Sequence, residues 1–178
     1  MQAQEDGTMT VELRDLGEGD ADWLVTQHGR LYKRDEGFDD SFPVLVRQVL
    51  DDFIAHRDPA RERAFIAWED GARLGSIFCA RSDDPDAAKL RLFLLMPEAR
   101  GKGLGRRLLA ENLAFARQAG YARMVLWTHE SHRAACALYA ATGWRLLRSE
   151  PKISFGVPVV EQAWEIDLST PRGKNFRD

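Results

Sequence analysis

Residues 92–120 read LFLLMPEARGKGLGRRLLAENLAFARQAG, and this stretch decides the fold. An apolar run of strand length ends at Pro97, and a turn with alternating glycines follows it. Gly120 stands where a helix stop is expected. The apolar residues between the turn and this stop recur with helical spacing, at Leu104, Leu108, Leu109, Leu113 and Ala116. The sequence therefore predicts a strand, a glycine turn and a helix in direct succession.

The glycine turn has the chemistry of an anion site. Gly101, Gly103 and Gly105 carry no Cβ atom, so a ligand can approach the backbone closely. The first N–H groups of the next helix lack partners within it, and the helix dipole favours a negative group there. Four cations add positive charge: Arg100, Lys102, Arg106 and Arg107. We expect a phosphorylated ligand here; the alternative is an ordinary strand–loop–helix with a solvated basic turn.

Glycine spacing narrows the choice of ligand. The fingerprint G-x-G-x-x-G of dinucleotide-binding enzymes does not fit the alternating glycines, and the Walker pattern is absent, which disfavours a dinucleotide oxidoreductase. Arg100-x-x-Gly103-x-Gly105, directly after a strand, resembles the acetyl-coenzyme A motif of the GNAT superfamily of N-acetyltransferases.

A second motif follows the first in the order that this family has. Residues 132–144 read HRAACALYAATGW and are similar to the family pattern N-x-x-A-x-x-L-Y-x-x-x-G-F. Tyr139 and Gly143 match in place, whereas His132 replaces the usual Asn and Trp144 the usual Phe. Within the superfamily, residues 28–32, 154–156 and 162–165 resemble the acetyltransferase half of proteins that also carry a winged-helix repressor domain.

Length and composition bound the remaining possibilities. A chain of 178 residues suits one domain, and its net charge of −3 gives no reason to expect nucleic acid or a membrane surface as partner. We expect a disordered leader at 1–9, the N-acetyltransferase domain at 10–169 and a polar tail at 170–178. Cys79 and Cys136 form neither a disulfide framework nor a zinc pattern, which favours a reducing cytoplasm. A homodimer is left open.

Periodicity predicts an α/β (α+β) domain, a single mixed, mostly antiparallel sheet of six to seven strands flanked by about four helices. The crossover from the strand through the glycine turn favours one parallel pair. We expect strands at 11–14, 64–68, 74–80, 89–96, 124–127, 144–147 and 161–168. Helices are expected at 21–33, capped by Asp20, from Ser41 to about 54, at 104–119, and at 129–142, capped by Ser131. Residues 35–40 and 151–158 are expected to be loops.

The resemblance implies acetyl-CoA as cosubstrate, with its diphosphate on the backbone N–H groups of 101–106. The pantetheine arm would lie along the strand near Leu95, and the thioester between strands 90–96 and 124–128. His132, in the Asn place, could hydrogen-bond this arm. The implied coenzyme-binding residues are Leu94, Leu95, Met96, Arg100, Gly101, Lys102, Gly103, Leu104, Gly105, Arg106 and His132.

The resemblance also makes Tyr139 the candidate general acid for the departing thiolate. The general base is open: Glu130 is the best-placed carboxylate by chain order, and a water chain is the alternative. For the acceptor we single out His28, Tyr32 and Glu36, with the acidic segment 35–40 attracting a cationic amine. His129 and His132 lack an H-E-x-x-H pattern and a third ligand, so no metal site is expected.

Together these features predict an N-acetyltransferase that moves an acetyl group from acetyl-CoA to a primary amine of a small molecule or peptide, by direct attack. The alternative is a non-catalytic acyl-CoA-binding sensor or partner module. The absence of a carboxylate from the strand before the glycine turn motivates this second interpretation.

Overall fold

The computed structural model describes residues 10–169, so the predicted leader 1–9 and tail 170–178 lie outside the described residues. Within 10–169 the chain forms seven strands: β1 (Glu12–Arg14), β2 (Arg63–Glu69), β3 (Ala72–Arg81), β4 (Ala87–Leu95), β5 (Arg123–His129), β6 (Arg145–Ser154) and β7 (Val157–Asp167). The helices of this range are α1 (Asp20–Glu36), α2 (Ser41–His56), α3 (Leu104–Gln118), α4 (Arg133–Ala141) and the 3-10 turn η1 (Pro97–Ala99). The predicted fold class is confirmed.

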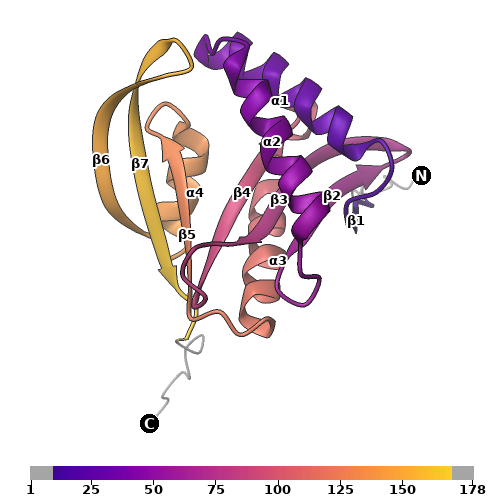
Figure 1. Ribbon diagram of the computed structural model, residues 1–178. Coiled ribbons are helices and arrows are strands. Elements are labelled where there is room, and N and C mark those ends of the chain that lie inside the picture. The colour runs from indigo at the N-terminus through magenta and orange to yellow at the C-terminus, as the bar shows by residue number, and fades with distance from the viewer. Residues whose placement is uncertain (1–9, 170–178) are drawn as a thin grey trace, which may run out of the picture.

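The seven strands form one sheet in the order β1-β2-β3-β4-β5-β7-β6. Every neighbouring pair is antiparallel except β4 and β5, which are parallel, as the crossover through α3 predicts. The parallel pairing covers only 87–89 of β4 against 123–125 of β5. Beyond these residues the two strands diverge (Figure 1). We call the opening between 90–95 and 126–129 the wedge.

A β-bulge in β4 helps to turn this strand away from β5. Phe78 of β3 pairs with Arg91, but Ser76 pairs with Leu94, so β4 has one residue more than β3 in this interval. Leu92 has a φ of 49°, and its carbonyl oxygen accepts a hydrogen bond of 2.6 Å from the Ser76 hydroxyl. The bulge changes which side chains of β4 face α2, so that Leu92 lies on the same face as Arg91.

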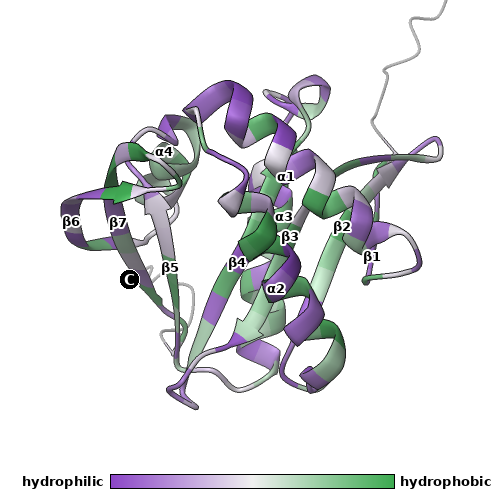
Figure 2. Ribbon diagram, turned by 45° about the horizontal axis from the view of Figure 1, so that its top comes forward, coloured by the Kyte–Doolittle hydropathy of each residue, from purple (hydrophilic) through white to green (hydrophobic). Residues whose placement is uncertain are grey.

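Helices cover both faces of the sheet. On one face α3 packs against the central strands, where Leu108, Leu109 and Met124 are almost fully buried in one cluster. On the other face α1 and α2 bury Leu24 and Leu50 against Phe78 of β3. Figure 2 shows the strands between these layers coloured mainly toward the hydrophobic end. No described helix is long and apolar enough to cross a membrane.

Two expectations about α1 are wrong. The helix continues to Glu36, so the first two residues of the expected acidic loop are helical. Asp20 does not cap the helix; it is the first helical residue and follows Gly19. Its carboxylate is buried, accepting a 2.6 Å hydrogen bond from Arg73 and a 2.7 Å bond from the Gly17 N–H. A buried ion pair with β3 therefore replaces the local cap that the sequence suggests.

Two expectations about the C-terminal third are also wrong. His129 belongs to β5, and α4 begins only at Arg133 without a side-chain cap from Ser131. The expected loop at 151–158 is a hairpin, because β6 continues through Pro151. Since β6 is an edge strand, a residue without an N–H group is tolerated there. Phe155 and Gly156, both with positive φ, form the two-residue turn.

Candidate active site

The glycine turn lies between the end of β4 and the start of α3. Gly101 and Gly103 have φ values of 75° and 82°, which favour glycine, and Cβ atoms there would meet nothing within 4 Å. Gly105 differs, because its Cβ would lie 3.1 Å from the Leu95 side chain within the first turn of α3. The backbone around Gly101 and Gly103 is therefore open to a ligand, whereas Gly105 allows α3 to pack closely on β4.

The four cations of this segment point to different places. Lys102 and Arg106 are exposed and make no ion pair with the described residues. Arg107 leaves the turn and donates a 2.8 Å hydrogen bond to the Val11 carbonyl. Arg100 turns back over the end of β4, donating 3.2 Å from Nε to the Leu95 carbonyl and approaching Asp35 of α1 at 3.7 Å. Two of the four cations thus remain free to meet a bound anion.

The end of β4 presents different side chains to the two faces of the sheet. Leu94 and Met96 pack with Leu31 of α1, whereas Leu95 packs on the α3 side. Beyond Lys89, no described strand pairs with the β5-facing edge of β4. The backbone groups along this edge of the wedge are thus available to an extended ligand with amide groups.

Tyr139, on α4, lies at the α3 face of the wedge. Its side chain is only 3% exposed, and its ring is 5.4 Å from that of Trp144 and 6.5 Å from that of Phe93. The hydroxyl makes no hydrogen bond to the described residues. Burial raises its pKa well above the usual value, and the nearby Tyr32 of α1 adds to this effect. Tyr139 is therefore held as a neutral phenol with a free proton donor.

The opposite mouth of the wedge holds a contact between α1 and the start of α4. Nε2 of His132 lies 3.3 Å from Oε1 of Glu36, and both side chains are less than one-fifth exposed. Nδ1 of His132 lies 3.1 Å from the Thr128 hydroxyl. Burial lowers the pKa of His132, although Glu36 opposes this shift. The neutral imidazole therefore sits between a hydroxyl and a carboxylate that can accept a proton.

Aromatic rings enclose this mouth. The ring of Tyr32 lies 4.5 Å from that of Phe42, 5.5 Å from that of Phe38 and 5.0 Å from that of His132. Phe155, in the turn between β6 and β7, lies 4.9 Å from Phe38 and completes the wall. Burial raises the pKa of Tyr32 to about 12. An amine that enters here would meet apolar walls and one carboxylate.

Two residues singled out from the sequence take no part in the contact between Glu36 and His132. Glu130 is exposed, directly after β5, and forms no ion pair with the described residues. His28 is 2% exposed, stacks on Tyr32 at 6.0 Å and donates a 2.8 Å hydrogen bond from Nδ1 to the Leu24 carbonyl. The buried position of His28 fits a role in supporting Tyr32. In contrast, Tyr32, Glu36, His132 and Tyr139 surround the wedge.

Sequence reasoning missed other residues of the site. Thr128 and His129 end β5; from the sequence, His129 is considered only as a helix start and a rejected metal ligand, and Thr128 has no assigned role. Phe155 was placed in a loop, although the positive φ that Gly156 permits is the signal for a tight hairpin turn. Among residues 10–169 no group of three or more His, Cys, Asp or Glu could hold a metal ion.

Comparisons with known proteins bear on the family and the fold of the chain. The model of the acetyltransferase (GNAT) family matches residues 26–144. The solved structure of yncA from Salmonella typhimurium, with its cofactor acetyl-CoA, aligns with a TM-score of 0.74 at 19% identity, covering 94% of this chain and 99% of that chain. Spermidine N-acetyltransferase from Vibrio cholerae, in complex with CoA and spermine, aligns with a TM-score of 0.69 at 19% identity, covering 89% and 96%.

A third similar structure is the IAA acetyltransferase from Bacillus cereus, with a TM-score of 0.64 at 15% identity, covering 89% of this chain and 99% of that chain. No curated protein gives a significant match. At these identities the solved structures show a shared fold. They do not bear on the finer resemblance to the acetyltransferase half of winged-helix repressors.

Proposed function

The chain belongs to the acetyltransferase (GNAT) family, and from that membership we propose that it acetylates a primary amine of a small molecule or peptide by direct attack. As an acetyltransferase of this family it takes its acetyl group from acetyl-CoA. The observation that carries the proposal is the placement of Glu36 and Tyr139 on opposite sides of the wedge. One can accept a proton from the amine, and the other can donate a proton to the thiolate.

The glycine turn is the proposed seat of the diphosphate. The open backbone at Gly101 and Gly103, the first N–H groups of α3 and the exposed Lys102 and Arg106 support this assignment. The β5-facing edge of β4 near Leu95 would then guide the pantetheine arm into the wedge. The Arg100 side chain donates a hydrogen bond to the Leu95 carbonyl, so we expect this side chain to move when the pantetheine arm binds.

The chemical step needs a neutral amine beside the thioester carbonyl, and Glu36 is the proposed proton acceptor. The amine nitrogen forms the new C–N bond, the C–S bond breaks, and the sulfur leaves as a thiolate. Glu36 takes the proton that the amine loses, and His132 holds the carboxylate in place. Tyr139 donates its phenolic proton to the sulfur, and solvent restores it afterwards. This assignment of the base replaces Glu130 with a carboxylate that faces the wedge.

The two thiols support direct attack over a covalent acetyl-enzyme. A nucleophilic cysteine needs a lowered pKa. Burial instead raises the pKa of Cys136, the thiol closer to the wedge, and raises that of Cys79 to about 12. Both thiols are free, which supports the further proposal that the protein works in a reducing compartment such as the cytoplasm.

Thiol release from acetyl-CoA across a panel of primary amines tests this function. We expect release only when an amine is present, with equal amounts of CoA and N-acetyl product. We also expect no acetyl group on the protein, by intact mass, after incubation with acetyl-CoA alone. Tight acetyl-CoA binding without release for any amine would instead favour the sensor alternative. A stoichiometric acetyl-enzyme would contradict direct attack.

A further inference from the structure

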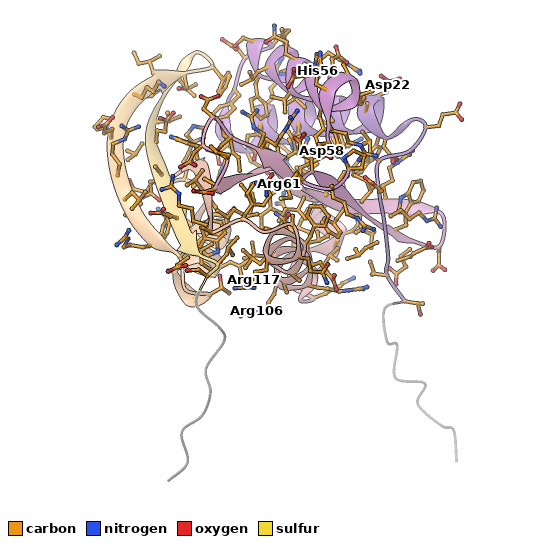
Figure 3. The ribbon with its side chains drawn as sticks, turned by 60° about the horizontal axis from the view of Figure 1, so that its bottom comes forward. Asp22, His56, Asp58, Arg61, Arg106 and Arg117 are labelled. Carbon is orange, nitrogen blue, oxygen red and sulfur yellow. The ribbon has the colours of Figure 1, made fainter. Side chains whose placement is uncertain are left out.

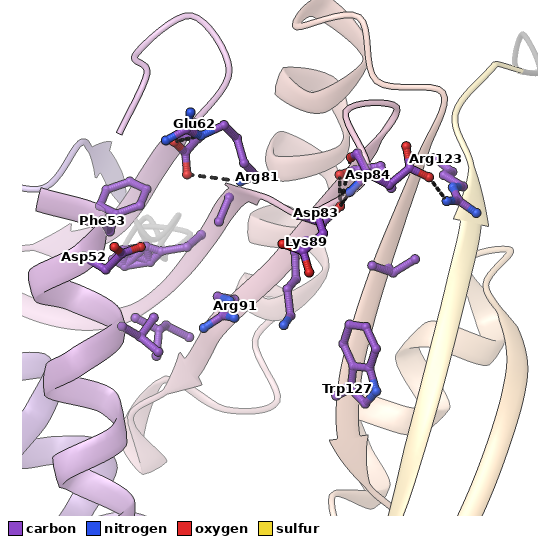
Figure 4. Close-up of a pocket in the computed structure, with 17 residues that line it drawn as sticks. Asp52, Phe53, Glu62, Arg81, Asp83, Asp84, Lys89, Arg91, Arg123 and Trp127 are labelled. Carbon is purple, nitrogen blue, oxygen red and sulfur yellow. Dashed lines mark hydrogen bonds and ion pairs between the residues drawn. The ribbon is translucent and has the colours of Figure 1, made fainter. Parts of the chain in front are cut away.

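A groove of about 680 Å³ opens on the α2 face of the sheet, next to the narrow end of the wedge. Its walls come from α2, β3, β4 and β5, and Figure 4 shows Lys89, Arg91 and Trp127 around the open space. This groove lies beyond the residues that the proposed chemistry uses. The side chains that line it therefore indicate which chemical groups the rest of the acceptor carries.

Two cations on β4 stand in the groove without a carboxylate partner. Lys89 and Arg91 are both half-buried, and neither makes an ion pair or hydrogen bond with the described residues. Lys89 Nζ lies 4.5 Å from the ring centre of Trp127, which is 48% exposed. Burial lowers the pKa of both cations, and Arg91 lowers that of Lys89 further, whereas Asp83 raises the pKa of Lys89 and Asp52 raises that of Arg91. Half-buried cations without partners are costly, and an anionic ligand would relieve that cost.

Regular strand alternation places these two cations on the same face of β4. Before the bulge, Lys89 and Arg91 alternate onto the α2 face, while Ala88 and Leu90 face α3. Leu92 then also lines the groove, because the bulge adds a residue on this face. A regular strand would have turned the residue after Arg91 to the α3 face.

None of the carboxylates that line the groove forms an ion pair with these two cations. Glu62 is 2.7 Å from Arg81, and Asp84 pairs with Arg123. Asp52 contacts His56 at 3.1 Å, and its side chain is 81% exposed. Asp83 is also exposed. Asp52 and Asp83 therefore lie at the solvent rim, whereas Lys89 and Arg91 rise from the strand that forms the floor.

The groove continues into the wedge mouth along one face of β5. Val125 and Trp127 line the groove, and His129, the next residue on the same face, lies 5.4 Å from the His132 ring. Lys89 pairs with Val125, and His129 is four residue steps along β5 from Val125. At about 3.3 Å per residue this is about 13 Å. Side chains reaching from both ends shorten the span to about 10 Å, the length of about three extended residues.

We propose that Lys89 and Arg91 bind an anionic group at the far end of the acceptor, so that the substrate is an amine with a carboxylate or phosphate about 10 Å from its nitrogen. This inference rests on the proposed function, because it takes Glu36 as the place of the amine. Trp127 would cover the middle of such an acceptor. A tripeptide with a free C-terminal carboxylate spans this distance and is a suitable probe.

Calorimetry with CoA present tests binding without turnover. Comparing triglycine with triglycine amide tests recognition of a carboxylate. Comparing aminooctyl phosphate with aminooctanol tests recognition of a phosphate. We expect the protein to bind at least one anionic member about tenfold tighter than its neutral partner, as a charge-assisted hydrogen bond predicts. In R91Q the affinities for the anionic probe and its neutral partner should lie within twofold of each other. R91K should keep most of the preference for the anionic probe.

Arg117 provides the matched control. It lies on α3, on the other side of the molecule from Asp22 and His56 of α1 and α2 (Figure 3), and makes no ion pair with the described residues. R117Q should keep the wild-type ratio. Equal binding within both pairs, no binding of any probe, or an unchanged ratio in a folded R91Q protein would overturn the inference. Selective binding without acetyl transfer would overturn the proposed function and leave the anion site standing.

Discussion

Glu36 at the end of α1 and His132 at the start of α4 meet at 3.3 Å at the mouth of the wedge. The contact joins a helix from one face of the sheet to a helix on the other. We propose that the Glu36 carboxylate receives the proton of the amine at this point, beside a thioester held between β4 and β5. This contact favours Glu36 over Glu130 as the proposed base.

E36Q tests the proposed base. The amide keeps the shape of the side chain but cannot accept the proton, so we expect kcat/KM for the amine to fall by about 10²-fold. The affinity for acetyl-CoA should stay within twofold. Initial rates at saturating acetyl-CoA measure the first effect and calorimetry the second.

E130Q is the matched comparison, because Glu130 is the base that chain order favours. If E130Q lost the activity and E36Q kept it, the assignment of the base to the wedge mouth would be wrong. Loss in neither variant would favour a water chain as the route for the proton.

Y139F tests the proton donor for the thiolate. Since Tyr139 makes no hydrogen bond to the described residues, its replacement should cost little stability. We expect kcat to fall by about 10²-fold, with unchanged affinity for acetyl-CoA. Burial raises the pKa of Tyr139, so the phenol stays protonated. As the pH is raised to 10, we therefore expect no loss of rate from ionisation of this group. Unchanged turnover in Y139F would remove Tyr139 from the mechanism.

G103V tests the seat of the diphosphate. A valine at a φ of 82° costs about 1–2 kcal/mol of stability, and its side chain would stand over the open backbone. We expect the Kd for acetyl-CoA to rise at least about tenfold, which corresponds to the loss of one charge-assisted contact.

G71V is the control for strain, since Gly71 has a φ of 76° in the β2–β3 turn and equally open surroundings. It should lose similar stability and keep its affinity. Equal affinities in the two variants would show that the turn at 101–106 does not hold the donor.

His28 predicts a pH dependence of stability. Burial lowers its pKa from 6.5 to about 4, so the unfolded chain binds the proton more tightly than the folded protein. Stability should therefore fall as the pH drops from 6.5 to 4, by about 3 kcal/mol from this residue. H28L should lack this component when urea unfolding at pH 7 and pH 4 is compared. H56L, which removes an exposed histidine from α2, should keep it.

The strand, glycine turn and helix at 92–120 were predictable because local patterns fix them: an apolar run, glycines with positive φ and helical spacing. The antiparallel pairing of β2, β3 and β4 and the crossover from β4 to β5 followed from the same kinds of signal. Pro151 misled the prediction, since its tolerance depends on β6 lying at the edge of the sheet, and strand order is not visible in a local pattern. Asp20 misled it for a similar reason, because its partner Arg73 lies in a distant strand.

The wedge residues were partly predictable. Motif positions placed Tyr139 and His132 near the reaction, and the acidic segment included Glu36. The contact between Glu36 and His132 could not be predicted, because it depends on how far α1 extends and on the angle at which β5 leaves β4. The groove with Lys89 and Arg91 was missed because it depends on how α2 packs beside β4 and β5, which no local sequence pattern shows.

A crystal structure with acetyl-CoA bound tests the central claim most directly. The account predicts diphosphate oxygens within about 3 Å of the N–H groups of residues 103–106. It also predicts the sulfur inside the wedge, within hydrogen-bond reach of the Tyr139 hydroxyl, with the acetyl group facing Glu36. A diphosphate bound elsewhere, or a thioester outside the space between β4 and β5, would contradict it.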